Sequence, residues 1–210
     1  ALAAYRSSVE AARRCYSEVG MRAWVTCNVL DTVMYDTIPW LGQLLPPELK
    51  AEFDDRPFPS TQEIVAFLNE TLGSLGGSRG ERVRLAVAPN GSTRCSDELL
   101  TSSWTLANKY DVPLVSHIQE SKAEVVMDER NYGSTAVAHL RDLGVLDHRF
   151  GVIHGVWLTH DDVEIIAGSG CSVITNPISN LKLGNGIAPV LQLLEAGAHV
   201  ALGTDGPTAN

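Results

Sequence analysis

The sequence lacks the features that mark membrane and nucleic-acid-binding proteins. No apolar run approaches the roughly 20 residues that a membrane-spanning helix needs, and no basic stripe is visible. The net charge is −9 and the pI is about 5.1, which argues against nucleic acid as a partner. The opening segment, residues 1–18, is amphipathic and carries arginines, so we expect no signal peptide there. The chain is therefore expected to be cytoplasmic, with neither a membrane nor a nucleic acid as its partner.

Cysteine and glycine motifs of common cofactor sites are also missing. Cys15, Cys27, Cys95 and Cys171 form no C-x-x-C pair, which excludes a zinc ribbon and a thioredoxin-type motif. Unpaired thiols favour a reducing compartment. No strand is followed by G-x-G-x-x-G, the fingerprint of a dinucleotide-binding fold, so an NAD-binding sheet is the weakest alternative.

What the sequence does contain is an alternation of strands and helices. Its 210 residues, 44% of them hydrophobic, suffice for one domain with a substantial core. Short apolar runs rich in β-formers predict strands, and they recur at roughly the 30-residue spacing of a βαβ unit. The predicted strands are 21–30, 83–89, 113–117, 150–154, 172–176 and 199–203.

Helical periodicity and capping residues predict the elements between these strands. Ser60 and Glu63 form a capping box, and Ser96 caps a helix with two acidic residues in its first turn. Residues 31–59 are proline-rich and predicted to be irregular, and 177–186 is predicted to be a loop. The predicted helices are 2–19, 47–53, 61–75, 97–110, 121–131, 135–143, 160–168 and 189–197.

Helix-separated strands pair in parallel, which leaves a doubly wound sheet or a (β/α)8 barrel. The barrel is favoured because candidate polar residues follow several successive strands rather than one switch point. Only six strands are predicted, so a complete barrel does not fit. We therefore expect an α/β fold in which residues 1–210 form a single incomplete barrel domain made of its later strands.

Candidate site residues stand where predicted strands end, and a parallel barrel brings those ends to one rim. Two imidazoles and two carboxylates without a thiolate suit a catalytic zinc or iron with an open position. A lone histidine at a strand end is more often structural, so the prediction depends on the set. The set comprises Asn90, His117, Glu120, His154, Asn176 and Asp205, whereas His139, His148, His160 and His199 are interpreted as structural or surface residues.

Several motifs together resemble the amidohydrolase superfamily, in its branch of cytosine and guanine deaminases and triazine hydrolases. They are His117-x-x-Glu120 and the runs at 152–158, 175–183 and 201–206. The resemblance is strong from about residue 85 to residue 210. It implies a metal-dependent hydrolase with a TIM-barrel fold that acts on C–N bonds other than peptide bonds.

The resemblance also implies a role for each matching residue. His117 and Asp205 would bind one divalent metal, zinc first and iron second, and Glu120 would carry protons. His154 would orient the water or the substrate, and Asp205 would also act as general base on the water. Hydroxide formed on the metal would then deaminate a nucleobase-like heterocycle, a small molecule. Asn90, Trp157 and Thr175 are expected to contact that substrate, although packing is an equal alternative for Trp157.

The sequence departs from the family in having no His-x-His motif, which supplies two metal ligands from the first strand. We therefore expect a fragment that is inactive alone, taken from an enzyme that is a homo-oligomer at full length. Two alternatives stay open. One is a triazine-type hydrolase that removes chloride or an alkylamine, and the other is a barrel that has lost catalysis and serves as a scaffold.

Overall fold

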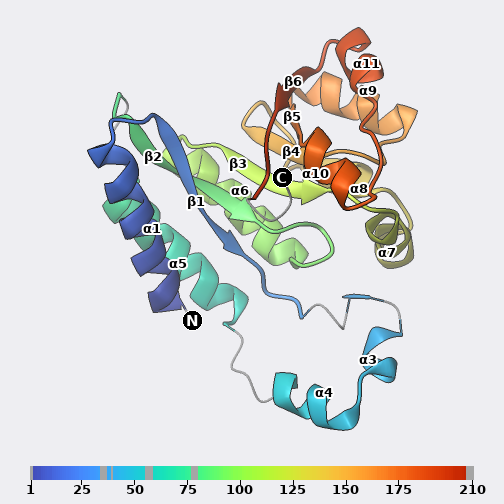
Figure 1. The fold of residues 1–210 in the computed structure, drawn as a ribbon, viewed down its shortest axis with the longest axis horizontal. Helices are drawn as coiled ribbons and strands as arrows, with labels where there is room; N and C mark the ends of the chain where they lie inside the picture. Colours follow the sequence, from blue (N-terminus) through green and yellow to red (C-terminus); the bar gives the residue numbers. More distant parts are fainter. Residues whose placement is uncertain (1, 34–36, 39, 55–58, 77–79, 207–210) are drawn as a thin grey trace. The chain divides into compact units, whose positions relative to one another are not determined.

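The computed structural model describes residues 2–33, 37–38, 40–54, 59–76 and 80–206 (Figure 1). Contacts between Cα atoms divide the chain into two compact units. The first comprises Ala1–Pro89 and Arg94–Val112, and the second comprises Asn90–Thr93 and Pro113–Asn210. That the whole chain forms one incomplete barrel domain stays a prediction.

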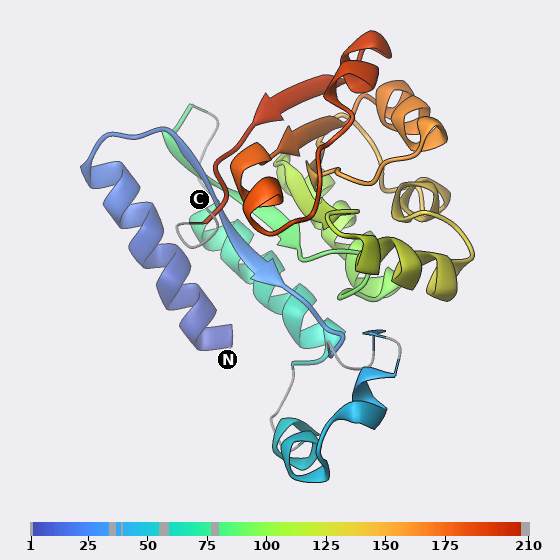
Figure 2. The same cartoon turned by 45° about the vertical axis from the view of Figure 1, so that its right-hand side comes forward.

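The first unit is built on two parallel strands, β1 (Ala23–Val29) and β2 (Val83–Pro89). They pair with Ala23 opposite Val83 and Val29 opposite Pro89. Two long helices, α1 and α5, run side by side along this pair in both views (Figures 1 and 2). The helices of this unit are α1 (Leu2–Glu18), α3 (Leu41–Leu44), α4 (Pro47–Asp54), α5 (Thr61–Leu75) and α6 (Asp97–Tyr110).

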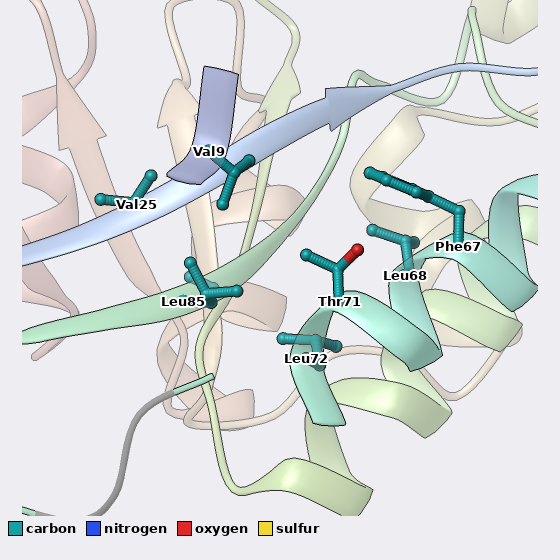
Figure 3. Close-up of a pocket in the computed structure, with 8 residues that line it drawn as sticks. Val9, Val25, Phe67, Leu68, Thr71, Leu72 and Leu85 are labelled. Atoms are coloured by element: carbon teal, nitrogen blue, oxygen red, sulfur yellow. The ribbon is translucent and has the colours of Figure 1, made fainter. Parts of the chain in front are cut away.

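The core of the first unit lies where α1 and α5 meet the strands. Val9 of α1, Val25 of β1 and Leu85 of β2 are buried and line a small hollow together with Leu68 and Leu72 of α5 (Figure 3). The lining is almost entirely apolar, so this hollow is part of the hydrophobic core and offers no chemistry for a ligand.

The second unit holds four parallel strands in sequence order, β3 (Leu114–Ile118), β4 (Phe150–His154), β5 (Ser172–Thr175) and β6 (His199–Leu202). Figure 2 shows β5 and β6 side by side, as their register requires. Buried Phe150, Val152 and Val173 fill the core of this unit. Its helices are α7 (Lys122–Tyr132), α8 (Ala136–Asp142), α9 (His160–Ser169), α10 (Pro177–Lys182) and α11 (Val190–Glu195).

The capping residues predicted from the sequence are confirmed. Ser60 and Glu63 form the expected capping box of α5, and the Ser96 hydroxyl accepts a hydrogen bond from the backbone N–H of Leu99 at the start of α6. Thr159 caps α9 in the same manner. Each cap satisfies backbone donors that the first turn of a helix leaves without partners, which is why the helices begin there.

Two elements differ from the prediction. The segment 177–186 was predicted to be a loop, but its first six residues form α10, because Pro177 occupies the first turn, where its missing N–H costs nothing. Within 31–59 the short helix near residue 47 is confirmed as α4, and α3 was not predicted. Residues 34–36, 39 and 55–58 of that segment lie outside the described residues. Among the described residues, no helix has both the length and the apolar character needed to cross a membrane.

Candidate active site

The candidate residues at strand ends belong to the second unit. His117 is the last residue but one of β3, and His154 is the last residue of β4. Thr175 ends β5, and Asp205 follows β6 by three residues. Because these strands are parallel and pair in sequence order, their carboxyl ends share one edge of the sheet. The four side chains therefore start from the same edge.

His117 is held by the segment that follows β2. Its backbone N–H donates to the carbonyl of Asn90 (3.0 Å), and its ring Nδ1 lies 2.9 Å from the same oxygen. A carbonyl can only accept, so Nδ1 carries a proton, and in the neutral imidazole the lone pair is then on Nε2. This is the tautomer of a histidine that binds a metal through Nε2. Asn90 thus contributes its backbone carbonyl.

His154 and Glu120 form a partly buried pair. His154 is 2% exposed, its Nδ1 lies 2.8 Å from Oδ1 of Asn180, and its Nε2 lies 3.5 Å from Oε2 of Glu120. The ring of His154 stacks on that of His117 with centroids 5.5 Å apart. Glu120 precedes the cap of α7, so it reaches this pair from a turn between β3 and the helix. The structure therefore brings His117, Glu120 and His154 together.

Asp205 is an ionised carboxylate. Its Oδ2 accepts a hydrogen bond from the hydroxyl of Ser179 (2.6 Å), and this bond does most to hold its pKa below the usual range. Partial burial raises the pKa, while the backbone N–H of Gly206 (2.7 Å) and the imidazoles of His154 and His117 lower it. The imidazoles of His117 and His154 therefore act electrostatically on the carboxylate of Asp205.

The backbone has a positive φ at or next to three of the candidate residues. Gln119, His154 and Asp205 have φ values of 49°, 72° and 61°, in the left-handed region that residues other than glycine seldom occupy. Each such residue costs on the order of 1 kcal/mol or more, and such residues cluster at functional sites. The three positions lie at or shortly after the ends of β3, β4 and β6, where the chain leaves the sheet.

The residues fit a divalent cation by the kind of donor that they offer. His117 offers Nε2 of its imidazole, and Asp205 presents an anionic carboxylate, which are nitrogen and oxygen ligands suited to zinc or iron. A catalytic zinc takes three protein ligands, and the described part of the chain holds no group of three His, Cys, Asp or Glu that could bind a metal. His117 and Asp205 can therefore supply only part of a coordination shell.

Trp157 and Thr175 differ in how they are held. The indole N–H of Trp157 donates to the carbonyl of Asn185 (2.8 Å), and the ammonium of Lys122 lies 4.6 Å from the ring centroid. Thr175 is 1% exposed, and its carbonyl accepts the N–H of Gly203. Thr175 is thus buried in the sheet, whereas the side chain of Trp157 is only half-buried.

Asn176 lies beside His154, with its Nδ2 3.4 Å from Nδ1 of that ring. The chain approaches it closely at Gly203, where an added Cβ would stand 2.2 Å from Oδ1 of Asn176. A glycine is therefore required there, which explains the glycine in the run that leads to Asp205.

Sequence reasoning missed the polar residues that hold the site together. Ser179, Asn180 and Asn185 hydrogen-bond to Asp205, His154 and Glu120 respectively. The first two lie in the run 175–183 that carries the family resemblance, which was a usable signal. Asn185 lies between two glycines, a setting more typical of a turn, and nothing local marks its partner.

The whole chain, residues 1–210, matches the family described as the amidohydrolase family. A relative from Thermococcus sibiricus, named 5-methylthioadenosine/S-adenosylhomocysteine deaminase, is 33% identical over 202 residues. That match covers 96% of this chain and 42% of the relative. The chain therefore spans about two fifths of the length of the curated relative that it matches.

Two solved structures share the fold. An adenosine deaminase from Xanthomonas campestris with bound zinc has a TM-score of 0.75 and 27% identity, covering 93% of this chain and 39% of that one. The zinc complex of an atrazine chlorohydrolase from Arthrobacter aurescens has a TM-score of 0.78 and 23% identity, covering 97% and 42%. The α/β fold expected from the sequence, a partial (β/α)8 barrel of the amidohydrolase type, is thus confirmed.

Proposed function

Because the chain belongs to the amidohydrolase family, we propose that the natural full-length protein hydrolytically deaminates a small nucleobase-like heterocycle. The observation that carries the proposal is the His154–Glu120 pair beside His117 at one edge of the sheet. Given the names of the Thermococcus and Xanthomonas proteins, nucleosides with a 6-aminopurine base are the first substrates to test.

Deamination makes two demands that these residues can meet. Water must be activated, and ammonia must leave with a proton, because the amide anion is a poor leaving group. A divalent metal, when bound, lowers the pKa of water toward neutrality. His117 and Asp205 would hold that metal, with zinc as the first candidate.

The residues of the chain would share the proton transfers. Glu120, 20% exposed at its side chain, can carry one proton of the attacking water to a ring nitrogen and the second proton of that water to the leaving amine. His154, held at Nδ1 by Asn180, would orient the water or the substrate. Asp205, anionic and fixed by Ser179, can act as general base on the water.

A substitution of the proton carrier tests this function. In the natural full-length protein, Glu120→Gln keeps the shape of the side chain but cannot carry a proton, so kcat should fall by about 10²–10⁴-fold. Ammonia release from purine nucleosides, pyrimidines, pterins and triazines is the measurement. Exposed Glu129 on α7 offers the matched control, and Glu129→Gln should leave the rate unchanged. An unsubstituted protein that releases no ammonia from any substrate contradicts the proposal.

A second candidate function has support in the atrazine chlorohydrolase fold match. Removal of chloride from a triazine needs no proton on the leaving group, whereas Glu120 lies beside His154 in a position to provide one. Assaying chloride, alkylamine and ammonia on the same panel separates the functions, and we expect ammonia alone.

A non-catalytic scaffold is a third candidate, favoured by the absence of a three-residue metal cluster from the described residues. Zinc measured in the purified full-length protein distinguishes it from the enzyme. About one zinc per chain supports the hydrolase, and a folded protein without metal or turnover supports the scaffold.

A further inference from the structure

The loop between α10 and α11 makes three hydrogen bonds through one residue, Asn185. Its backbone N–H donates to the carbonyl of Asn180 (2.8 Å), and its carbonyl accepts from the indole of Trp157 (2.8 Å). Its side-chain Nδ2 donates to Oε1 of Glu120 (2.8 Å). A single loop position thus connects an aromatic ring with the carboxylate that we propose as the proton carrier.

The position of the Glu120 side chain depends on its contact with Asn185, because Glu120 precedes α7 and is not held by a helix. It stands in the turn before α7, where its backbone N–H donates to Oε2 of Glu124 (2.7 Å). That bond fixes the backbone and leaves the side chain to other partners. One carboxylate oxygen is held by Asn185, and the other lies 3.5 Å from Nε2 of His154. The amide of Asn185 therefore decides which oxygen faces the imidazole.

The loop cannot easily move away from this position. Gly186 has a φ of 121°, which side chains rarely allow, and a Cβ there would stand 3.1 Å from Val156 and 3.4 Å from Trp157. The backbone of the loop therefore packs closely against Trp157. On the other side, the N–H of Asn185 is tied to Asn180, whose side chain also holds His154. Asn180 of α10 and Asn185 of this loop thus hold the two members of the His154–Glu120 pair.

We propose that Asn185 is a positioning residue, which holds the carboxylate of Glu120 and the indole of Trp157 in one fixed arrangement for a planar heterocycle. The inference rests on the proposed function. An amide N–H that donates to a carboxylate favours its ionised form and fixes its direction, both of which a proton acceptor needs before the reaction begins. The adjacent aromatic ring offers a flat apolar surface to the same substrate.

Substitutions of Asn185 can separate the two contacts, because Trp157 is bound by the backbone carbonyl and Glu120 by the side chain. Asn185→Leu keeps the side-chain size but removes the donor. Asn185→Asp keeps the shape but sets an acceptor against Glu120. Exposed Asn131 on α7 provides the control Asn131→Leu. All variants are made in the natural full-length protein and assayed for ammonia release from a 6-aminopurine nucleoside between pH 5 and pH 9.

Loss of one hydrogen bond to a charged group should lower kcat by about 10-fold or more in Asn185→Leu, with a smaller change in KM. The acid limb of the kcat profile should move to higher pH, and further in Asn185→Asp, where two carboxylates adjoin. Asn131→Leu should match the unsubstituted protein.

Two results would overturn the inference. One is a kcat within twofold of the unsubstituted value. The other is a lower rate with an unshifted pH profile, since structural damage alone reduces the active fraction without moving the profile. If the unsubstituted protein releases no ammonia from any substrate, the proposed function itself fails. If it is active and the Asn185 variants behave like it, only the inference fails.

Discussion

Each unit of the chain has an aspartate shortly after a strand, and the two carboxylates have different partners. In the first unit Asp31 follows β1 and accepts hydrogen bonds from the N–H and hydroxyl of Ser96 (2.7 and 2.5 Å) and the hydroxyl of Thr61 (2.8 Å). These hydrogen bonds, which use both carboxylate oxygens of Asp31, hold the starts of α5 and α6. In the second unit Asp205 accepts hydrogen bonds from Ser179 and Gly206, and the imidazoles of His154 and His117 lower its pKa. The position of a carboxylate after a strand does not by itself make it a candidate metal ligand. The side chains around the carboxylate decide whether it is one.

The same substitution in both units should have its largest effect at Asp205. In the natural full-length protein, Asp205→Asn removes the anionic ligand, and we expect bound zinc and kcat/KM each to fall by at least about 10-fold. Asp31→Asn, the matched control, should leave both unchanged. Zinc content by elemental analysis and ammonia release are the measurements. Equal zinc content in the two variants would contradict the assignment of Asp205.

A third aspartate, Asp128 in α7, differs from both in how its charge affects stability as the pH changes. Asp128 is fully buried, and its pKa is raised to about 7, chiefly by burial and less by the charges of Glu124 and Asp162, while a hydrogen bond from Ser92 lowers it. The folded protein therefore keeps a proton that the unfolded chain loses near pH 4. The stability that Asp128 contributes is fully present below that pH. It is lost as the pH rises toward 7, by up to about 1.4 kcal/mol per pH unit.

Asp128→Asn should remove this contribution, which urea unfolding at pH 4, 5.5 and 7 would measure. Asp205 has the opposite sign, because its lowered pKa adds stability that is lost as the pH falls. If Asp128→Asn retains the slope of the unsubstituted protein between pH 4 and pH 7, another group is responsible for it.

The smallest effect is expected at Asp31, and it concerns stability alone. Asp31→Asn weakens bonds to the starts of two helices, so the free energy of unfolding should fall by about 1–2 kcal/mol. Urea unfolding measures the loss, and Glu129→Gln, an exposed change on α7, is the control. A loss of turnover without a loss of stability would place Asp31 in the active site.

Much of the fold could be predicted because its signals are local. The strands 83–89 and 150–154 were predicted with the observed bounds, since each is an apolar run between turn residues. The helix starts at Ser60 and Ser96 follow from capping chemistry within three residues. The helix α10 was missed because its six residues include proline, serine and asparagine, a composition typical of turns.

The candidate site was only partly predictable, because its contacts join distant positions. The placement of His117 and His154 at strand ends follows from local apolar runs, and their roles stay predictions. By contrast, Asn185 and Glu120 are 65 positions apart, and no periodicity or cap relates them. Likewise, the sequence alone does not show how the partners of the two aspartates differ, with Asp31 bonded to Thr61 and Ser96 and Asp205 bonded to Ser179. Such distinctions depend on which side chains the tertiary fold brings into contact.

The most direct test of the central claim is a crystal structure of the natural full-length protein grown with zinc, with the metal located by its anomalous scattering. The proposal predicts a peak bound by Nε2 of His117 and a carboxylate oxygen of Asp205, each at about 2.0–2.2 Å. Zinc bound elsewhere, or His117 and Asp205 directed at separate partners in a metal-loaded crystal, would contradict it.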